Sequence, residues 1–186
     1  DWGAMVAWHL ALTHPDRIDR LGILNVPHPY VFQRTLRTSL RQLLRSAYVF
    51  FFQVPGLPEW VLGRKDGQGL RWLMQRSADP DTFTTADLRA YRRAWRRPGR
   101  LRGMLNWYRA AGRRALRMSP TADLIEVPTL VLWGARDTAL TQQMAVPSAD
   151  LCTDGRLVVI DDATHWVQHD APKRVTQHLL DHLGTA

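Results

Sequence analysis

Lysine, cysteine and long apolar runs are scarce in this sequence, and each shortage excludes something. Lys65 and Lys173 are the only lysines among 25 basic residues, so arginine supplies nearly all the positive charge. Because Cys152 is the single cysteine, the chain cannot form an internal disulfide, and a reducing, cytoplasmic location is expected. The longest apolar run covers residues 47–52. A membrane span needs roughly 18 residues or more, so no stable membrane insertion is expected.

What is present favours a folded domain of ordinary size. The chain has 186 residues, of which 45% are hydrophobic and 8 are tryptophan, enough to build a sizeable core. A charged fraction of 23% is typical of globular proteins and argues against disorder.

Positive charge is concentrated in the middle of the chain. Residues 31–120 hold 19 basic and 5 acidic side chains, while the rest of the chain holds 6 and 12. Such a block could attract nucleic acid, an anionic membrane or acidic substrates. Its arginines, however, are interleaved with apolar residues at helical spacing, at Leu36, Leu40, Leu43 and Leu44. This pattern is typical of a helix with a solvated basic face, so no nucleic-acid partner is expected.

Continuous apolar runs bounded by turn residues predict strands that are buried in a parallel sheet. These runs lie at residues 18–26, 127–134 and 156–160. Helical patterns flank them, at residues 5–12, 141–149 and 172–183. The alternation of strands and helices indicates an α/β fold in which helices flank a parallel sheet.

The segment from residue 28 to residue 118 has helical patterns only, broken by proline and glycine. The breaks fall at residues 55–58, 63–69, 79–81 and 98–99. They predict four or five helices with no strand between them. Thr84, followed by Asp87, is typical of a helix N-terminus. We therefore expect a helical cap at residues 28–118, inserted between core segments at residues 1–27 and 119–186.

Three polar residues stand where α/β sheets place catalytic groups. Asp1 precedes the first helix, Asp137 follows the second predicted strand, and His165 follows the third. The carboxyl ends of parallel strands meet at one edge of the sheet, where ligands bind. Each residue alone is more often a turn former or a satisfied polar group. In the order nucleophile, acid, histidine they match the α/β-hydrolases and predict a catalytic triad.

The chain begins with Asp-Trp-Gly-Ala, and residues 24–27, 128–137 and 163–172 continue the same pattern. These segments resemble the epoxide hydrolase and haloalkane dehalogenase branch of the α/β-hydrolase family. The resemblance implies that Asp1 is the nucleophile and that the backbone N–H of Trp2 is an oxyanion-hole donor. In this family the acid can also follow the earlier strand, but Asn25 holds that place and cannot carry a charge. The family's strands before the nucleophile and its His-Gly-x-Pro loop are missing, so we expect a truncated chain that is inactive alone.

Two tyrosines in the expected cap favour epoxides as substrates. Tyr48 lies in Tyr-Val-Phe-Phe-Phe-Gln-Val-Pro-Gly, and Tyr108 lies in Leu-Asn-Trp-Tyr-Arg. Both segments are similar to those that carry the cap tyrosines of relatives acting on epoxides. Tyr30 and Tyr91 match neither segment and are expected to pack in the core. The resemblance therefore implies an epoxide hydrolase, with a haloalkane dehalogenase or another hydrolase with this triad as alternatives.

The mechanism that the resemblance implies needs only groups of the protein itself and water. Asp1 attacks an epoxide carbon while Tyr48 and Tyr108 donate hydrogen bonds to the ring oxygen. His165, oriented by Asp137, then activates the water that hydrolyses the ester to a vicinal diol. No cofactor is expected, and no metal, since His165 and His169 lack further ligands.

The partners expected from the sequence are a small hydrophobic epoxide and water. Apolar residues of the cap, among them Phe50, Phe51, Trp60 and Trp107, favour a hydrophobic substrate. A homodimer is compatible with the sequence. The non-enzymatic alternative is an inactive chain whose basic cap binds an acidic partner.

Overall fold

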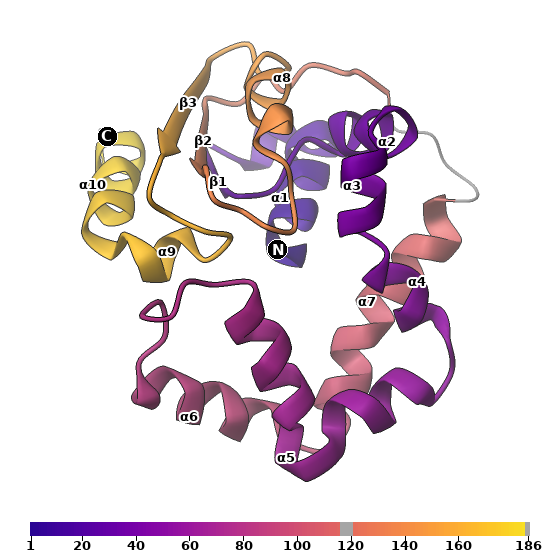
Figure 1. Cartoon of the computed structure of the whole chain (residues 1–186). Coiled ribbons are helices and arrows are strands. Elements are labelled where there is room, and N and C mark those ends of the chain that lie inside the picture. Colours follow the sequence, from indigo (N-terminus) through magenta and orange to yellow (C-terminus); the bar gives the residue numbers. More distant parts are fainter. Residues whose placement is uncertain (116–120, 185–186) are drawn as a thin grey trace. The chain divides into compact units, whose positions relative to one another are not determined.

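The computed structural model describes residues 1–115 and 121–184, which group into two compact units (Figure 1). The first unit joins Asp1–Leu43 to Pro120–Ala186 and contains the sheet. The second unit, Leu44–Ser119, is helical. The α/β fold with a parallel sheet that the sequence predicts is confirmed in the first unit.

Three parallel strands form the sheet of the first unit, with β2 between β1 and β3. Their bounds are Leu21–Leu24 for β1, Thr129–Gly134 for β2 and Gly155–Ile160 for β3. Ile23 is paired with Val131, which is paired in turn with Leu157. Every residue of β2 is buried, which explains why its sequence is an unbroken apolar run instead of an alternating one.

Successive side chains of β2 belong to two different buried clusters. Trp133 shares a buried cluster with Trp8 of α1, while Leu132 shares another with Val175 of α10. Because neighbouring side chains of a strand point to opposite faces, helices cover the sheet on both sides. The helices of this unit are α1 (Trp2–Thr13), η1 (Pro15–Arg17), α2 (Pro29–Thr38), most of α3 (Leu40–Arg45), η2 (Gln142–Met144), α8 (Ala145–Ala149), α9 (Val167–Asp170) and α10 (Pro172–Leu183).

The described part of the second unit packs its helices around a small core of its own. This buried cluster consists of Phe52, Leu62, Leu70 and Leu105. The predicted break at residues 63–69 appears as a kink in α5, where residues 64–67 leave helical geometry. The helices are α4 (Tyr48–Gln53), α5 (Leu57–Arg76), α6 (Thr85–Trp95) and α7 (Arg100–Ala115).

The start of α6 follows the prediction from sequence. The Thr84 hydroxyl accepts a hydrogen bond from the Asp87 N–H at 3.1 Å, and the Asp87 carboxylate accepts one from the Thr84 N–H at 2.9 Å. This reciprocal capping box satisfies backbone donors that a helix leaves unpaired at its first turn.

The described residues between 28 and 118 form six helices, so our expectation of four or five is wrong. The difference lies before residue 54, where α2, α3 and α4 follow one another. The turns that separate them, at Ser39 and residues 46–47, contain neither proline nor glycine and give no strong signal in the sequence.

Helix α3 buries a polar residue instead of its leucines. Leu40, Leu43 and Leu44 are all exposed, whereas Gln42 is fully buried. The apolar spacing that predicts this helix therefore does not mark its buried face.

Among the described residues, no helix combines the length and apolar character that crossing a membrane requires.

Candidate active site

The loops after β2 and β3 bring an acid and a histidine together. Nδ1 of His165 lies 2.7 Å from Oδ2 of Asp137. The side chain of Asp137 is 1% exposed and that of His165 is 15% exposed. A hydrogen bond this short between a carboxylate and an imidazole fixes the orientation of the ring.

Glycine at the end of β2 allows this close approach. A Cβ atom at Gly134 would collide with the backbone oxygens of Ala163 and Thr164, which lead into His165. The loop is held from its other end by Asp170, whose carboxylate accepts hydrogen bonds from the Thr164 N–H at 2.7 Å and hydroxyl at 2.6 Å. The position of His165 is thus set by backbone packing on one side and by Asp170 on the other.

Asp137 is held as a carboxylate by donors from separate segments. Oδ1 accepts hydrogen bonds from the N–H groups of Ala139 at 2.7 Å and Leu140 at 2.8 Å, while Oδ2 accepts from Nδ2 of Asn25 at 2.8 Å. Burial alone would raise the pKa of Asp137, but the hydrogen bond and charge of His165, with the other donors, hold this pKa below its usual value. Asp137 is therefore an acceptor at neutral pH, which places the hydrogen of His165 on Nδ1.

Asn25 has a structural role that sequence reasoning missed. We considered it only as a neutral residue at the alternative acid position. Its Nδ2 donates a hydrogen bond to Asp137, and its Oδ1 accepts one from the Gly134 N–H at 2.9 Å. Its φ of 51° lies in the left-handed region, which asparagine tolerates better than most residues. One buried side chain thus joins the end of β1 to the end of β2 and to the acid.

Replacing Asn25 by alanine is expected to lower the free energy of unfolding of the complete protein by about 2–4 kcal/mol. The change leaves the Gly134 N–H without its acceptor, at about 1–3 kcal/mol, and adds about 1 kcal/mol of strain at positive φ. Asn25→Gly is the matched control, because glycine removes the strain but not the hydrogen-bond loss. Urea unfolding measures both, and equal stability of the two variants would contradict the strain contribution.

Asp1 stands at the N-terminus of α1, where its Oδ1 accepts a hydrogen bond from the Trp2 N–H at 2.8 Å. The positive end of the helix dipole stabilises a carboxylate at this position. Asp1 thus caps a helix of the first unit, the same unit that carries Asp137 and His165.

The two predicted cap tyrosines lie together in the second unit. Tyr48 is the first residue of α4, and its ring centroid is 5.9 Å from that of Tyr108 on α7. Phe52 packs edge-on against both, at 5.3 Å and 4.9 Å. The other two tyrosines lie elsewhere, as expected. Tyr30 packs against the core of the first unit, and Tyr91 against aromatic neighbours in the second.

Comparison with known proteins identifies the family to which this chain belongs. The family model described as alpha/beta hydrolase fold matches residues 1–172. The chain belongs to this family. It is 38% identical over 183 residues to the AB hydrolase superfamily protein YfhM of Bacillus subtilis, and 34% identical over 184 residues to human epoxide hydrolase 4. These matches cover 98% and 95% of this chain but only 63% and 50% of the two relatives.

Solved structures show the same relationship. The chain matches an epoxide hydrolase from Bacillus megaterium in complex with an inhibitor with a TM-score of 0.87 and 27% sequence identity. The match covers all of this chain and 67% of that one. It also matches epoxide hydrolase A from Mycobacterium thermoresistibile with a TM-score of 0.80 and 28% identity. The chain is thus related to epoxide hydrolases at moderate identity.

Gln42 also supports the acid loop, and nothing in its local sequence indicated this. Its Nε2 donates to the Ala139 carbonyl at 2.9 Å, and its Oε1 accepts from the Thr141 N–H at 2.9 Å. Two hydrogen bonds therefore attach the loop that begins at Asp137 to α3. A buried amide with two backbone partners is satisfied, which explains why Gln42, and not its leucine neighbours, faces inward.

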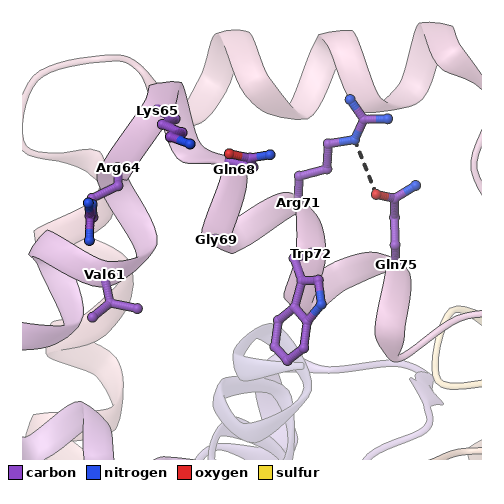
Figure 2. Close-up of a pocket in the computed structure, with 8 residues that line it drawn as sticks. All are labelled: Val61, Arg64, Lys65, Gln68, Gly69, Arg71, Trp72 and Gln75. Carbon is purple, nitrogen blue, oxygen red and sulfur yellow. Dashed lines mark hydrogen bonds between the residues drawn. The ribbon is translucent and has the colours of Figure 1, made fainter.

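Neither Cys152 nor the pocket along α5 belongs to the candidate active site. Burial raises the pKa of the Cys152 thiol to about 11, so this group is not a competing nucleophile at neutral pH. The pocket along α5 has a volume of about 770 Å³, and Figure 2 shows the residues that line it. It contains none of the predicted site residues, and its lining consists of Val61, Arg64, Lys65, Gln68, Gly69, Arg71, Trp72 and Gln75.

Proposed function

We propose that the complete protein hydrolyses hydrophobic epoxides to vicinal diols through an ester formed on Asp1. The tyrosine pair is the observation that carries this proposal, with ring centroids 5.9 Å apart on two helices. Two phenols held this close can serve one small acceptor, such as the oxygen of an epoxide ring. The kinship with epoxide hydrolases from bacteria and animals supports the same reaction.

Ring opening is the first half of the proposed reaction. One oxygen of the Asp1 carboxylate forms a bond to an epoxide carbon while the bond from that carbon to the ring oxygen breaks. Negative charge develops on the leaving oxygen, where hydrogen bonds from Tyr48 and Tyr108 stabilise it, and one of the two transfers its proton. The product is a hydroxyalkyl ester of Asp1 and a tyrosinate.

Hydrolysis of the ester is the second half. With its Nδ1 hydrogen donated to Asp137, His165 accepts a proton from water on Nε2, and the water oxygen attacks the ester carbon. The oxyanion that forms is an oxygen of Asp1 itself. The Trp2 N–H already donates to Oδ1 of Asp1 at 2.8 Å and is placed to stabilise that charge. Collapse breaks the bond from the ester carbon to the alkoxide oxygen, which takes the second proton of the attacking water and leaves as the diol. The proton on His165 then passes to the tyrosinate.

A single turnover in heavy-oxygen water tests this function directly. Because the attacking water adds to the Asp1 carbonyl, the label should appear in the Asp1 carboxylate after one turnover with excess protein over styrene oxide. Peptide mass spectrometry locates it. Label found in the diol alone would overturn the covalent mechanism, since it would mean that water attacks the epoxide directly.

Haloalkane dehalogenation is the alternative, because the Asp1-Trp2 pair also begins the elbow of that branch. It shares the ester chemistry but needs no proton donors for the leaving group. Parallel assays with styrene oxide and with bromoalkanes separate the two. Halide release without diol formation would replace the proposed reaction by dehalogenation.

A further inference from the structure

We propose that Arg109, paired with Glu59, is the positioning residue that sets the placement of Tyr48 against Tyr108. The inference rests on the proposed function, in which the two tyrosines donate to the ring oxygen. It concerns contacts within the second unit only. Through hydrogen bonds to backbone carbonyls, Arg109 holds the helix that carries Tyr48 to the helix that carries Tyr108.

Helix α4 needs such support because it is only six residues long, Tyr48–Gln53. Helices this short are unstable by themselves, since nucleation costs more than so few hydrogen bonds return. No side chain caps its N-terminus at Ala47. The carbonyl groups of its last turn also lack partners within the helix and must be satisfied from outside.

Arg109 supplies those partners. Its Nε donates to the Phe52 carbonyl at 3.0 Å and its Nη2 to the Val54 carbonyl at 3.1 Å. Arg109 immediately follows Tyr108 on α7, so these bonds join the end of the Tyr48 helix to the site of the second tyrosine. The planar guanidinium suits this role because its donors point in fixed directions.

Glu59 fixes the guanidinium from the other side. The carboxylate forms a fork with Arg109, with Nη1 at 2.7 Å from Oε1 and Nη2 at 3.0 Å from Oε2. The two side chains are only 14% and 22% exposed, so water competes little for them. Bidentate pairs of this kind add geometric specificity as well as energy. The hydrogen bond and charge of Arg109 accordingly hold the pKa of Glu59 below its usual value.

Gln53 also links α4 to α7 by a hydrogen bond. Nε2 of Gln53 donates to the Tyr108 carbonyl at 3.1 Å and to the Val49 carbonyl at 3.0 Å. Gly112 leaves room for it, because a Cβ there would lie 2.9 Å from Oε1 of Gln53. The edge-on contacts of Phe52 with both tyrosines add to this support.

Removal of Arg109 takes away its hydrogen bonds to the Phe52 and Val54 carbonyls. It is therefore expected to loosen α4 and the Tyr48 ring, while Asp137 and His165 stay in place in the first unit.

Step-resolved kinetics of the complete protein tests the inference. Arg109→Lys keeps the charge but cannot serve two carbonyls and a carboxylate in fixed directions, and Glu59→Gln removes the anionic half of the fork. We expect ring opening to slow by about 10- to 100-fold in Arg109→Lys and by about tenfold in Glu59→Gln, because small misplacements of catalytic groups cost this much. Hydrolysis of the ester should keep its rate. Rapid quenching after mixing with styrene oxide, with mass spectrometry of the Asp1 ester, measures each step.

The matched control is Asp66→Asn, which breaks the pair between Asp66 and Arg92 in the same unit, 2.7 Å long but about half exposed on both sides. It should leave both rates unchanged. Variants that behave like this control, or that slow both steps equally, overturn the positioning role. If Arg109→Lys does not fold, Glu59→Gln decides, since it keeps the guanidinium and its donors and removes only the charge that orients them. A wild-type protein that forms no ester fails the proposed function instead, which is a separate result.

Discussion

A complete protein carrying His165→Gln is expected to accumulate an ester on Asp1 and to release almost no diol. Ring opening uses Asp1 and the tyrosines, so it should proceed, whereas the ester can no longer be hydrolysed without the base that activates water. Steady-state turnover should fall by about 10⁴- to 10⁶-fold, the range found when a member of a comparable triad is removed. Intact-protein mass spectrometry should show a mass increase equal to that of the epoxide.

His169→Gln is the matched control for this experiment. His169 lies four residues further along the chain, and its ring packs against that of Trp166. Its replacement should leave turnover nearly unchanged and trap no ester. An inactive His165→Gln protein whose mass stays that of the free chain would show that the histidine is needed before, not after, the covalent step.

The second large effect is expected from the tyrosines. Tyr48→Phe and Tyr108→Phe should each slow ring opening by about 100-fold, and the double change by about 10⁴-fold, because each variant removes a donor to the developing alkoxide. Stability should change little, since only a hydroxyl is lost and the ring packing on Phe52 stays. Presteady-state formation of the Asp1 ester measures the rate, and thermal unfolding checks the fold.

Tyr91→Phe provides the comparison, because Tyr91 lies in the same unit but packs against Phe83 and Trp95, away from the pair. It should retain the wild-type rate of ring opening. If both single variants of the pair open the ring as fast as Tyr91→Phe, epoxides are the wrong substrate class. Their rate on a bromoalkane, which has no ring oxygen to protonate, should not depend on either hydroxyl.

The accuracy of the sequence predictions depends on how local the signal is. The terminal helix was predicted at residues 172–183 and is found at Pro172–Leu183, because its apolar face repeats at helical spacing. The buried strand predicted at residues 127–134 is β2, Thr129–Gly134, for the same kind of reason. The helices before residue 54 were miscounted because their turns lack proline and glycine, the residues that mark most breaks.

The residues of the candidate site also differ in how local their sequence signal is. Asp137 and His165 could be found from sequence because each follows an apolar run, and parallel strands deliver their ends to one edge. Asn25 and Gln42 could not. Their bonds span 112 positions to Asp137 and 99 positions to Thr141, and no local pattern encodes such a partner.

The sequence by itself determined the fold class of this protein, the order of its strands along the chain and the residue types for nucleophilic chemistry. Periodicity and turn residues are properties of neighbouring positions, so they can be recognised in the sequence without the structure. Only the tertiary structure decided that a buried asparagine holds the acid, and that an arginine 50 positions from its glutamate joins the helices of the two tyrosines. These are hydrogen bonds between buried or partly buried polar groups, and packing of the apolar faces decides which groups become partners.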